Sequence, residues 1–229
     1  MEYPHNRPYT ADDLVRIITL LRDPVNGCPW DKVQTHTSIR MNFLEEAYEA
    51  VDALDLDDPV LMCEELGDVL MQVAFHTCME QETGRFTWEQ VCDGVCQKLI
   101  ERHPNIFGTQ PGYEGITDWD ALKNKEKGRR TLADDLESVP RAMPALMRAA
   151  KLQKRAARHG AALQGADAAA LADAAENLQT AQPASAQAEQ AVGELLFAAA
   201  NLARQAGGDP EQALQKANEA FCTATGPVA

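Results

Sequence analysis

The stretch NFLEEAYEAVDALDLDDPVLMCEELGDVLMQVAF, residues 42–75, decides the fold of this chain. Both of its halves are strong helix-forming sequence, and only the short segment 56–59 separates them. An antiparallel helix hairpin with so short a connection brings its two helices face to face. We therefore predict two neighbouring helices, one from about Ile39 to Leu54 and one from about Pro59 to Glu82.

Carboxylates gather on one side of the first of these helices. At about 100° per residue, Glu45, Glu49 and Asp52 fall within roughly 60° of one another. The opposite side is apolar and comprises Phe43, Ala47, Ala50 and Leu54. This pattern predicts an acidic stripe backed by the hydrophobic core.

The second helix carries its own acidic cluster. Glu65 and Asp68 share a face, and Gln72 lies between them in projection. Carboxylates held this close repel one another unless a cation lies among them, and without imidazole or thiolate they suit Mg²⁺ or Mn²⁺. A solvated helix face is the commoner explanation for either cluster alone. Two clusters on facing helices make a Mg²⁺ site an equal alternative.

Length and charge limit the classes of partner. The chain has 229 residues, enough for one large domain or two small ones. Its formal net charge of −14, with no basic stripe, argues against DNA or RNA as the main partner. A nucleotide is not excluded, because Mg²⁺ and a few nearby cations can reverse the field at one site.

The sequence also predicts a compartment. The N-terminal segment MEYPHNRPYTADD, residues 1–13, lacks the apolar run of a signal peptide, and no apolar run elsewhere is long enough to span a membrane. The six cysteines form no CxxC pair, which favours free thiols in a reducing environment. We therefore expect a cytoplasmic protein.

Helical patterns continue on both sides of the acidic hairpin. Thr10 can cap a helix from Ala11 to Leu21, and Thr87 can cap one from about Trp88 to Arg102. The Pro- and Gly-punctuated segment 22–30 separates the first helix from the hairpin. No alternating strand pattern occurs, so we predict an all-α fold whose first part is a small four-helix bundle.

A second helical half is expected from about Val139. Further helices are predicted over residues 143–158, 192–205 and 210–221, with an Ala-rich stretch over 160–192. Between the halves, residues 109–138 are expected to form a polar connector with one short helix around residues 119–126.

The two halves look like copies of one unit. VGELLFAAANLARQAG, starting at Val192, echoes LGDVLMQVAFHTCMEQETG, starting at Leu66, so that GE at residues 193–194 matches GD at residues 67–68. Internal duplication of an all-helical unit is the economical interpretation. The second copy has lost most of the charged groups. In the alignment of the two halves, Ala191 takes the place of Glu65, and Ala220 and Ala224 take the places of Lys98 and Arg102. The segment DAAEN, residues 173–177, aligns with the first acidic cluster.

A di-iron carboxylate bundle also has acidic helices, but it needs Glu-x-x-His on two of them. The only such spacing in this chain is Glu2-x-x-His5, which contains Pro4 at the polar N-terminal segment. We therefore set this alternative aside.

The motif EEAYE at residues 45–49, followed by ELGD at residues 65–68, resembles the hallmark of the MazG family of all-α nucleoside triphosphate pyrophosphohydrolases. Further stretches look like its two-repeat bacterial members: LRDPVNGCPWDKVQTHTS (21–38), KLIERHPNIFG (98–108), WDALKNKE (119–126) and VPRAMPALMRAAKLQKRAA (139–157). The resemblance covers essentially the whole chain. It implies a duplicated four-helix bundle, with a catalytic first repeat over 1–108, a connector over 109–138 and a degenerate, truncated second repeat over 139–229.

The chemistry that the resemblance implies is hydrolysis of a nucleoside triphosphate to the monophosphate and pyrophosphate. We expect Glu45, Glu49, Glu65 and Asp68 to be direct ligands of Mg²⁺, with Mn²⁺ as an alternative ion. Glu46, rotated by about 100° from Glu45 on the helix, is expected to orient or deprotonate water, or to hold a second metal ion.

Substrate contacts are expected from two other places. Lys98 and Arg102 are an i, i+4 pair suited to phosphate oxygens, although a solvent-exposed basic pair has the same spacing. Trp30, with Asp31 and Lys32, lies in a loop that could stack on and hold a base, although a tryptophan at such a position is more often a core residue.

Some features receive weaker or no assignments. Lys123 and Lys125 are weaker candidates for the phosphate tail, and His36, His76 and His103 are interpreted as structural because none has a paired nucleophile. The alternative to an enzyme is a non-catalytic or regulatory nucleotide-binding member of the family. The decayed second half favours that alternative, whereas the charges retained in the first half oppose it. We expect nucleoside triphosphates and a second copy of the chain, in a homodimer, as partners.

Overall fold

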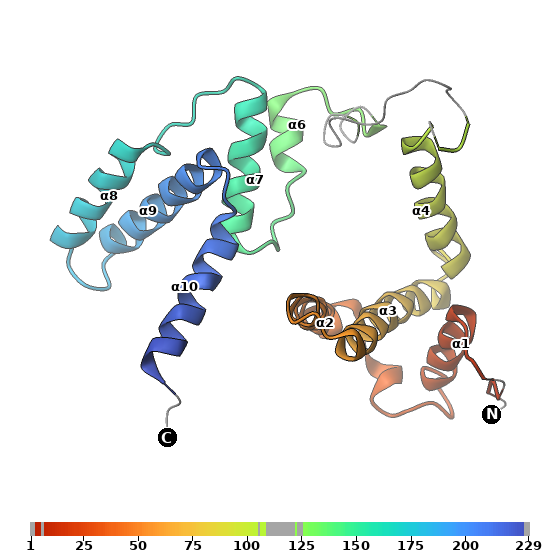
Figure 1. The fold of residues 1–229 in the computed structure, drawn as a ribbon. Coiled ribbons are helices and arrows are strands. Elements are labelled where there is room, and N and C mark those ends of the chain that lie inside the picture. The colour runs from red at the N-terminus through yellow and green to blue at the C-terminus, as the bar shows by residue number, and fades with distance from the viewer. Residues whose placement is uncertain (1–2, 6, 105, 109–121, 123–125, 227–229) are drawn as a thin grey trace. The chain divides into compact units, whose positions relative to one another are not determined.

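The computed structural model of this chain describes residues 3–5, 7–104, 106–108, 122 and 126–226. Every regular element within these ranges is a helix, as the sequence predicts. The chain divides into two units, Met1–Ile116 and Thr117–Ala229, whose helices are drawn in Figure 1.

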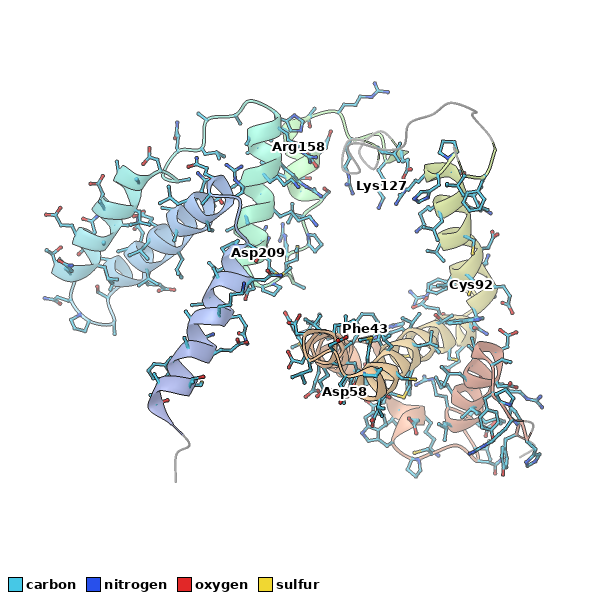
Figure 2. All side chains as sticks on the ribbon, viewed as in Figure 1. Phe43, Asp58, Cys92, Lys127, Arg158 and Asp209 are labelled. Atoms are coloured by element: carbon cyan, nitrogen blue, oxygen red, sulfur yellow. The ribbon has the colours of Figure 1, made fainter. Side chains whose placement is uncertain are left out.

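Unit 1 (Met1–Ile116) comprises α1 (Ala11–Leu21), the short 3₁₀ helix η1 (Asp31–Val33), α2 (His36–Asp55), α3 (Pro59–Glu82) and α4 (Trp88–Arg102). Capping side chains explain where these helices begin. Thr10, Thr35 and Thr87 each accept a backbone hydrogen bond three residues on and form capping boxes for α1, α2 and α4. Asp58, labelled in Figure 2, caps α3 just before Pro59 by accepting from two backbone N–H groups.

Helix α3 is central to unit 1, because α1, α2 and α4 all pack against it. The core contains buried side chains from all four helices: Val15, Ile18, Ile39, Ala74, Phe75, Cys78, Met79 and Trp88. The part of α3 within this core is its C-terminal half. Glu65 and Asp68 lie in the N-terminal half of α3, which contributes none of these buried core residues.

The loop between α1 and α2 is held against α3 by Arg22. This arginine is 8% exposed and donates to both carboxylate oxygens of Glu82, at 2.5 and 2.8 Å. It also donates to the backbone carbonyl of Asp31 at 2.7 Å. Gly27 is needed in this loop, because a Cβ there would lie 2.4 Å from the carbonyl oxygens of Leu21 and Asp23. The loop is therefore tightly folded and pinned to α3.

Unit 2 (Thr117–Ala229) comprises α6 (Leu132–Glu137), α7 (Ala145–Arg158), α8 (Ala168–Thr180), α9 (Ala186–Gln205) and α10 (Pro210–Thr225). Asp135 of α6 is 1% exposed and lies 3.1 Å from the guanidinium of Arg155 and 3.2 Å from the ring of His159. These contacts join α6 to α7. Pairing is required here, because a buried carboxylate without such partners is strongly unfavourable.

The helices of the two units pack in the same pattern. In unit 1, α3 contacts α1, α2 and α4, and in unit 2, α9 contacts α7, α8 and α10. The hairpins α2–α3 and α8–α9 are therefore comparable, although α10 also contacts α7 in unit 2. The internal duplication stays a prediction from the sequence.

The predicted helices differ from the structure mainly at their ends. Helix α2 begins at His36 and α9 at Ala186, both earlier than predicted, because the side chains of Thr35 and Ser185 accept backbone hydrogen bonds and cap the helices there. Helix α6 lies in the segment predicted as a connector, where Thr131 and Asp134 form a capping box. The short helix predicted around residues 119–126 falls mainly on positions outside the described residues.

Among the described residues, no helix combines the length and the apolar character that crossing a membrane requires.

Candidate functional site

Three carboxylates meet at the α2–α3 interface. Glu46 and Glu49 on α2 and Glu65 on α3 each offer one oxygen atom, and these oxygens all lie within 4.8 Å of one another. We call these three residues the acidic triad. Their ligand set contains oxygen only, which suits Mg²⁺ or Mn²⁺ better than softer metals.

The face that α2 turns toward the interface explains why Glu46 belongs to the triad. Ala50 and Ala53 are 5% and 0% exposed, and Glu46 precedes Ala50 by one helical turn. Glu45 lies on the exposed part of α2, outside the triad. Leu54, which the sequence placed on the buried side, is 51% exposed. Small alanine side chains pack α2 against α3, so the buried face is centred on Ala50 and Ala53 and is rotated by roughly 60° from the prediction.

Asp68 lies beside the triad without being one of its three members. Its negative charge helps to raise the pKa of both Glu46 and Glu65 above the ordinary glutamate value. Burial is the larger cause in each case, and neighbouring carboxylates add to it. Burial and mutual repulsion thus both disfavour the charged forms of Glu46 and Glu65, and a cation would offset the repulsion.

Gln72 lies on the α3 face that carries Asp68, one turn further along the helix. Its side chain is 7% exposed, and its Nε2 group donates to Oε1 of Glu46 at 3.4 Å. This hydrogen bond lowers the pKa of Glu46, against the effect of burial. The sequence placed Gln72 on this face but gave it no role.

Beyond Gln72, the α2–α3 interface remains polar. Nδ1 of His36 lies 2.7 Å from Nδ1 of His76, and the two rings stack with centroids 5.0 Å apart. The other ring nitrogen of His36 contacts Glu80 at 2.6 Å, and Glu80 also pairs with Arg85 at 2.6 Å. Burial lowers the pKa of His76, and the neighbouring His36 adds to this effect.

The loop candidates Trp30, Asp31 and Lys32 lie at and beside η1. Trp30 is 57% exposed, so it is not a core residue, and the edge of its ring faces Phe75 at a centroid distance of 6.5 Å. Asp31 and Lys32 are half-buried, and the backbone carbonyl of Asp31 is bound by Arg22. An exposed indole on a pinned loop is able to stack on a base.

The cationic candidates lie on α4, which packs against α3. Lys98 is exposed and Arg102 is half-buried. The weaker candidates Lys123 and Lys125 fall outside the described residues.

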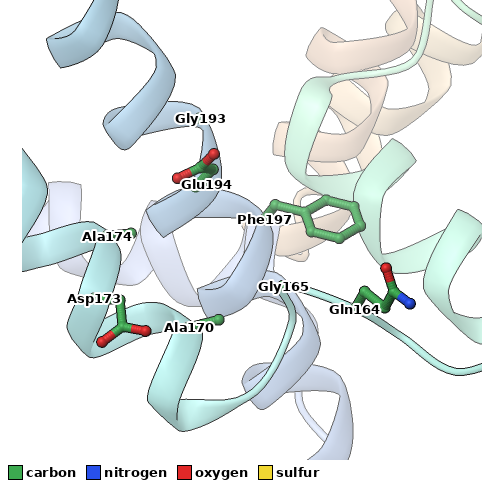
Figure 3. Close-up of a pocket in the computed structure, with 8 residues that line it drawn as sticks. All are labelled: Gln164, Gly165, Ala170, Asp173, Ala174, Gly193, Glu194 and Phe197. Atoms are coloured by element: carbon green, nitrogen blue, oxygen red, sulfur yellow. The ribbon is translucent and has the colours of Figure 1, made fainter.

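In unit 2 the corresponding hairpin has no acidic triad among the described residues. Its counterpart of Glu65, Ala191, is 2% exposed. A cavity of about 690 Å³ opens beside α8 and α9, with Asp173, Glu194 and Phe197 in its lining (Figure 3). The two carboxylates in this lining come from different helices, but no third one joins them.

Comparison with known proteins assigns the family. Residues 34–107, which hold both acidic helices, match the model of the MazG nucleotide pyrophosphohydrolase domain. A nucleoside triphosphate pyrophosphohydrolase of Escherichia coli (strain K12) is 41% identical over 219 residues, covering 92% of this chain and 83% of that protein. The nucleoside triphosphate pyrophosphohydrolase/pyrophosphatase MazG of Thermotoga maritima is 38% identical over 212 residues, covering 92% of this chain and 82% of that protein.

A third relative, the nucleoside triphosphate pyrophosphohydrolase of Mycobacterium tuberculosis, is 35% identical over 154 residues, covering 66% of this chain and 46% of that protein. The first two similarities run through both units, and the domain match lies on the hairpin that carries the acidic triad. The chain therefore belongs to the MazG nucleotide pyrophosphohydrolase family, whose members are hydrolases.

Proposed function

We propose that this protein is a Mg²⁺-dependent nucleoside triphosphate pyrophosphohydrolase that uses the acidic triad of unit 1. The single observation that carries the proposal is the meeting of Glu46, Glu49 and Glu65 within 4.8 Å at the α2–α3 interface. The products are the nucleoside monophosphate and pyrophosphate. The names of the E. coli and T. maritima relatives support the reaction type.

The residues present fit a magnesium ion. Their oxygens are close enough to share one cation, and the raised pKa values of Glu46 and Glu65 reflect a charge that a cation would offset. We assign Glu46, Glu49 and Glu65 as ligands, with Asp68 as a fourth from the same face of α3. Bound Mg²⁺ supplies charge neutralisation for the triphosphate and a water molecule of lowered pKa.

Glu45 takes the remaining acidic role in this proposal. It lies on the exposed side of α2 next to Glu46, and its charge contributes to the raised pKa of Glu46. A carboxylate that lies near the cation but does not bind it can orient a water molecule or accept a proton from that water. The sequence alone suggests the other assignment, in which Glu45 is the ligand and Glu46 acts on water or holds a second metal ion.

Trp30 and the α4 cations complete the substrate site in the proposal. The exposed indole of Trp30 would stack on the base, and Asp31 and Lys32 would hold its edge. Lys98 and Arg102 would contact phosphate oxygens that the metal does not cover. Apolar residues exposed on α2, α3 and α4, among them Val51, Leu66 and Val95, support a homodimer that covers them. A monomer mass by light scattering would contradict that part.

The test is product identification. Purified protein is incubated with Mg²⁺ and each common ribo- and deoxyribonucleoside triphosphate, and the products are separated by ion-exchange chromatography. Monophosphate with pyrophosphate, abolished by EDTA, is the expected result. Diphosphate with inorganic phosphate would overturn the assignment of the scissile bond. Binding of nucleotide without any product would favour a regulatory nucleotide-binding protein.

A further inference from the structure

Gln72 is hydrogen-bonded to one member of the acidic triad. Its Nε2 group donates to Glu46, and its Oε1 atom is buried with no hydrogen-bond partner among the described residues. A buried amide oxygen without a donor costs about 1–3 kcal/mol. Such a cost persists in a native structure where a bound species supplies the missing donor.

Gln153 in unit 2 shows that burial alone does not mark a site. It is 1% exposed, donates through Nε2 to the carbonyl of Phe197 at 2.7 Å, and also has an unpartnered Oε1 atom. What distinguishes Gln72 is the acceptor of its hydrogen bond. That acceptor is a carboxylate whose oxygen lies within 4.8 Å of oxygens from Glu49 and Glu65.

A carboxylate that binds a metal ion usually needs a second partner to fix its orientation. Glu46 has three side-chain torsions, and freezing them on metal binding costs free energy. A hydrogen bond from a side chain that is itself held by burial restricts those torsions before the ion arrives. The amide donor engages Oε1 of Glu46, and a carboxylate has a second oxygen with which it can bind a cation.

We propose that Gln72 is a positioning residue of the cation site, in which Nε2 orients Glu46 and Oε1 accepts a hydrogen bond from a water molecule that hydrates the ion. Mg²⁺ and Mn²⁺ in protein sites commonly keep several water ligands. Because such a water molecule uses an oxygen lone pair to bind the ion, it offers its O–H groups as hydrogen-bond donors. The inference rests on the cation site of the proposed function. It adds a residue that touches neither ion nor substrate directly.

The test measures Mn²⁺ binding to the full chain by electron paramagnetic resonance of the free ion, without nucleotide. Gln72→Met removes both polar atoms at nearly constant length, and it is expected to weaken Mn²⁺ binding by about 10- to 100-fold. Gln153→Met removes a similarly buried amide in unit 2, which carries no acidic triad among its described residues, and is expected to change Mn²⁺ affinity by less than about twofold. Thermal unfolding without metal establishes that both variants fold.

Gln72→Asn is the second variant, which keeps an amide but is too short by one methylene to reach Glu46. It is expected to weaken Mn²⁺ binding as well, while remaining polar enough to fold if Gln72→Met does not. Unchanged Mn²⁺ affinity in a folded Gln72 variant would overturn the inference and leave the triad standing. Wild-type protein that binds no Mn²⁺ would overturn both the inference and the cation site.

Discussion

At the scale of single residues, the acidic triad is a source of instability in the metal-free protein. Glu46 and Glu65 have pKa values raised first by burial and then by neighbouring carboxylates. A raised folded-state pKa means that the group contributes stability below its unfolded pKa. That contribution is lost as the pH rises through the folded value. At neutral pH, therefore, the charged forms of Glu46 and Glu65 disfavour the folded state, and a bound cation would offset this effect.

Replacing Glu65 with glutamine tests this account of the triad. Without metal at neutral pH, Glu65→Gln is expected to unfold at a higher temperature than wild type, because one repelling charge is gone. Added Mg²⁺ is expected to raise the unfolding temperature of wild type and to have little effect on the variant. Thermal scans with EDTA and with Mg²⁺ measure both effects. A metal-free variant less stable than wild type would contradict the account.

At the scale of helices, the sequence predicted the bounds of the acidic hairpin well. It predicted less well which face of α2 is buried against α3. The bounds of α3 follow from Asp58, Pro59 and the turn after Glu82, and these signals are local. Which face of α2 is buried depends on packing against α3. There Ala50 and Ala53 pack closely, whereas the larger Leu54 stays exposed. Periodicity alone did not resolve that rotation, so it did not show that Glu46, rather than Glu45, lies beside Glu49 and Glu65.

Other parts of the site were equally hard to predict, because they join distant segments. Arg22 and Glu82 pin the loop that carries Trp30, and His36 stacks on His76 across the hairpin. No local pattern in the sequence links the members of either pair. His36 and His76 contact each other, and His36 also contacts Glu80. A structural role for these two histidines stays a prediction.

The α2–α3 interface is expected to weaken in mild acid because of His76. Burial and His36 lower its folded-state pKa below the ordinary value of 6.5. A lowered histidine pKa means that stability is complete above the unfolded value and is lost as the pH falls through the folded one. The groups facing His76 are His36 and Phe43 from α2, with Glu80 held by His36.

His76→Gln tests this expectation, because glutamine cannot titrate but still offers a donor to His36. Urea unfolding at several pH values between about 7 and 5, around the histidine pKa, measures the free energy of unfolding of both proteins. The wild-type value is expected to fall more steeply toward acid than that of the variant. Parallel curves would show that His76 is not the titrating group.

At the scale of the whole molecule, two units share one helix-packing pattern but differ in their charged groups. Unit 1 holds the acidic triad, the pinned loop with Trp30, and the cations of α4. In unit 2, Ala191 stands in the place of Glu65, and Glu194 lines an open cavity without a carboxylate cluster around it. The all-helical fold could be predicted from the sequence because both units keep a clear helical pattern. We therefore expect the activity to belong to unit 1.

The most direct test of that assignment compares Glu49→Gln with Glu194→Gln in a Mg²⁺-dependent turnover assay. Glu49 is exposed on α2, so its replacement should leave the fold intact, as circular dichroism can confirm. We expect Glu49→Gln to lower kcat/KM by more than about 100-fold, because it removes one ligand charge from the triad. Glu194→Gln is expected to stay within about twofold of wild type. Full activity in Glu49→Gln, or a large loss in Glu194→Gln, would contradict the central claim that unit 1 carries the active site.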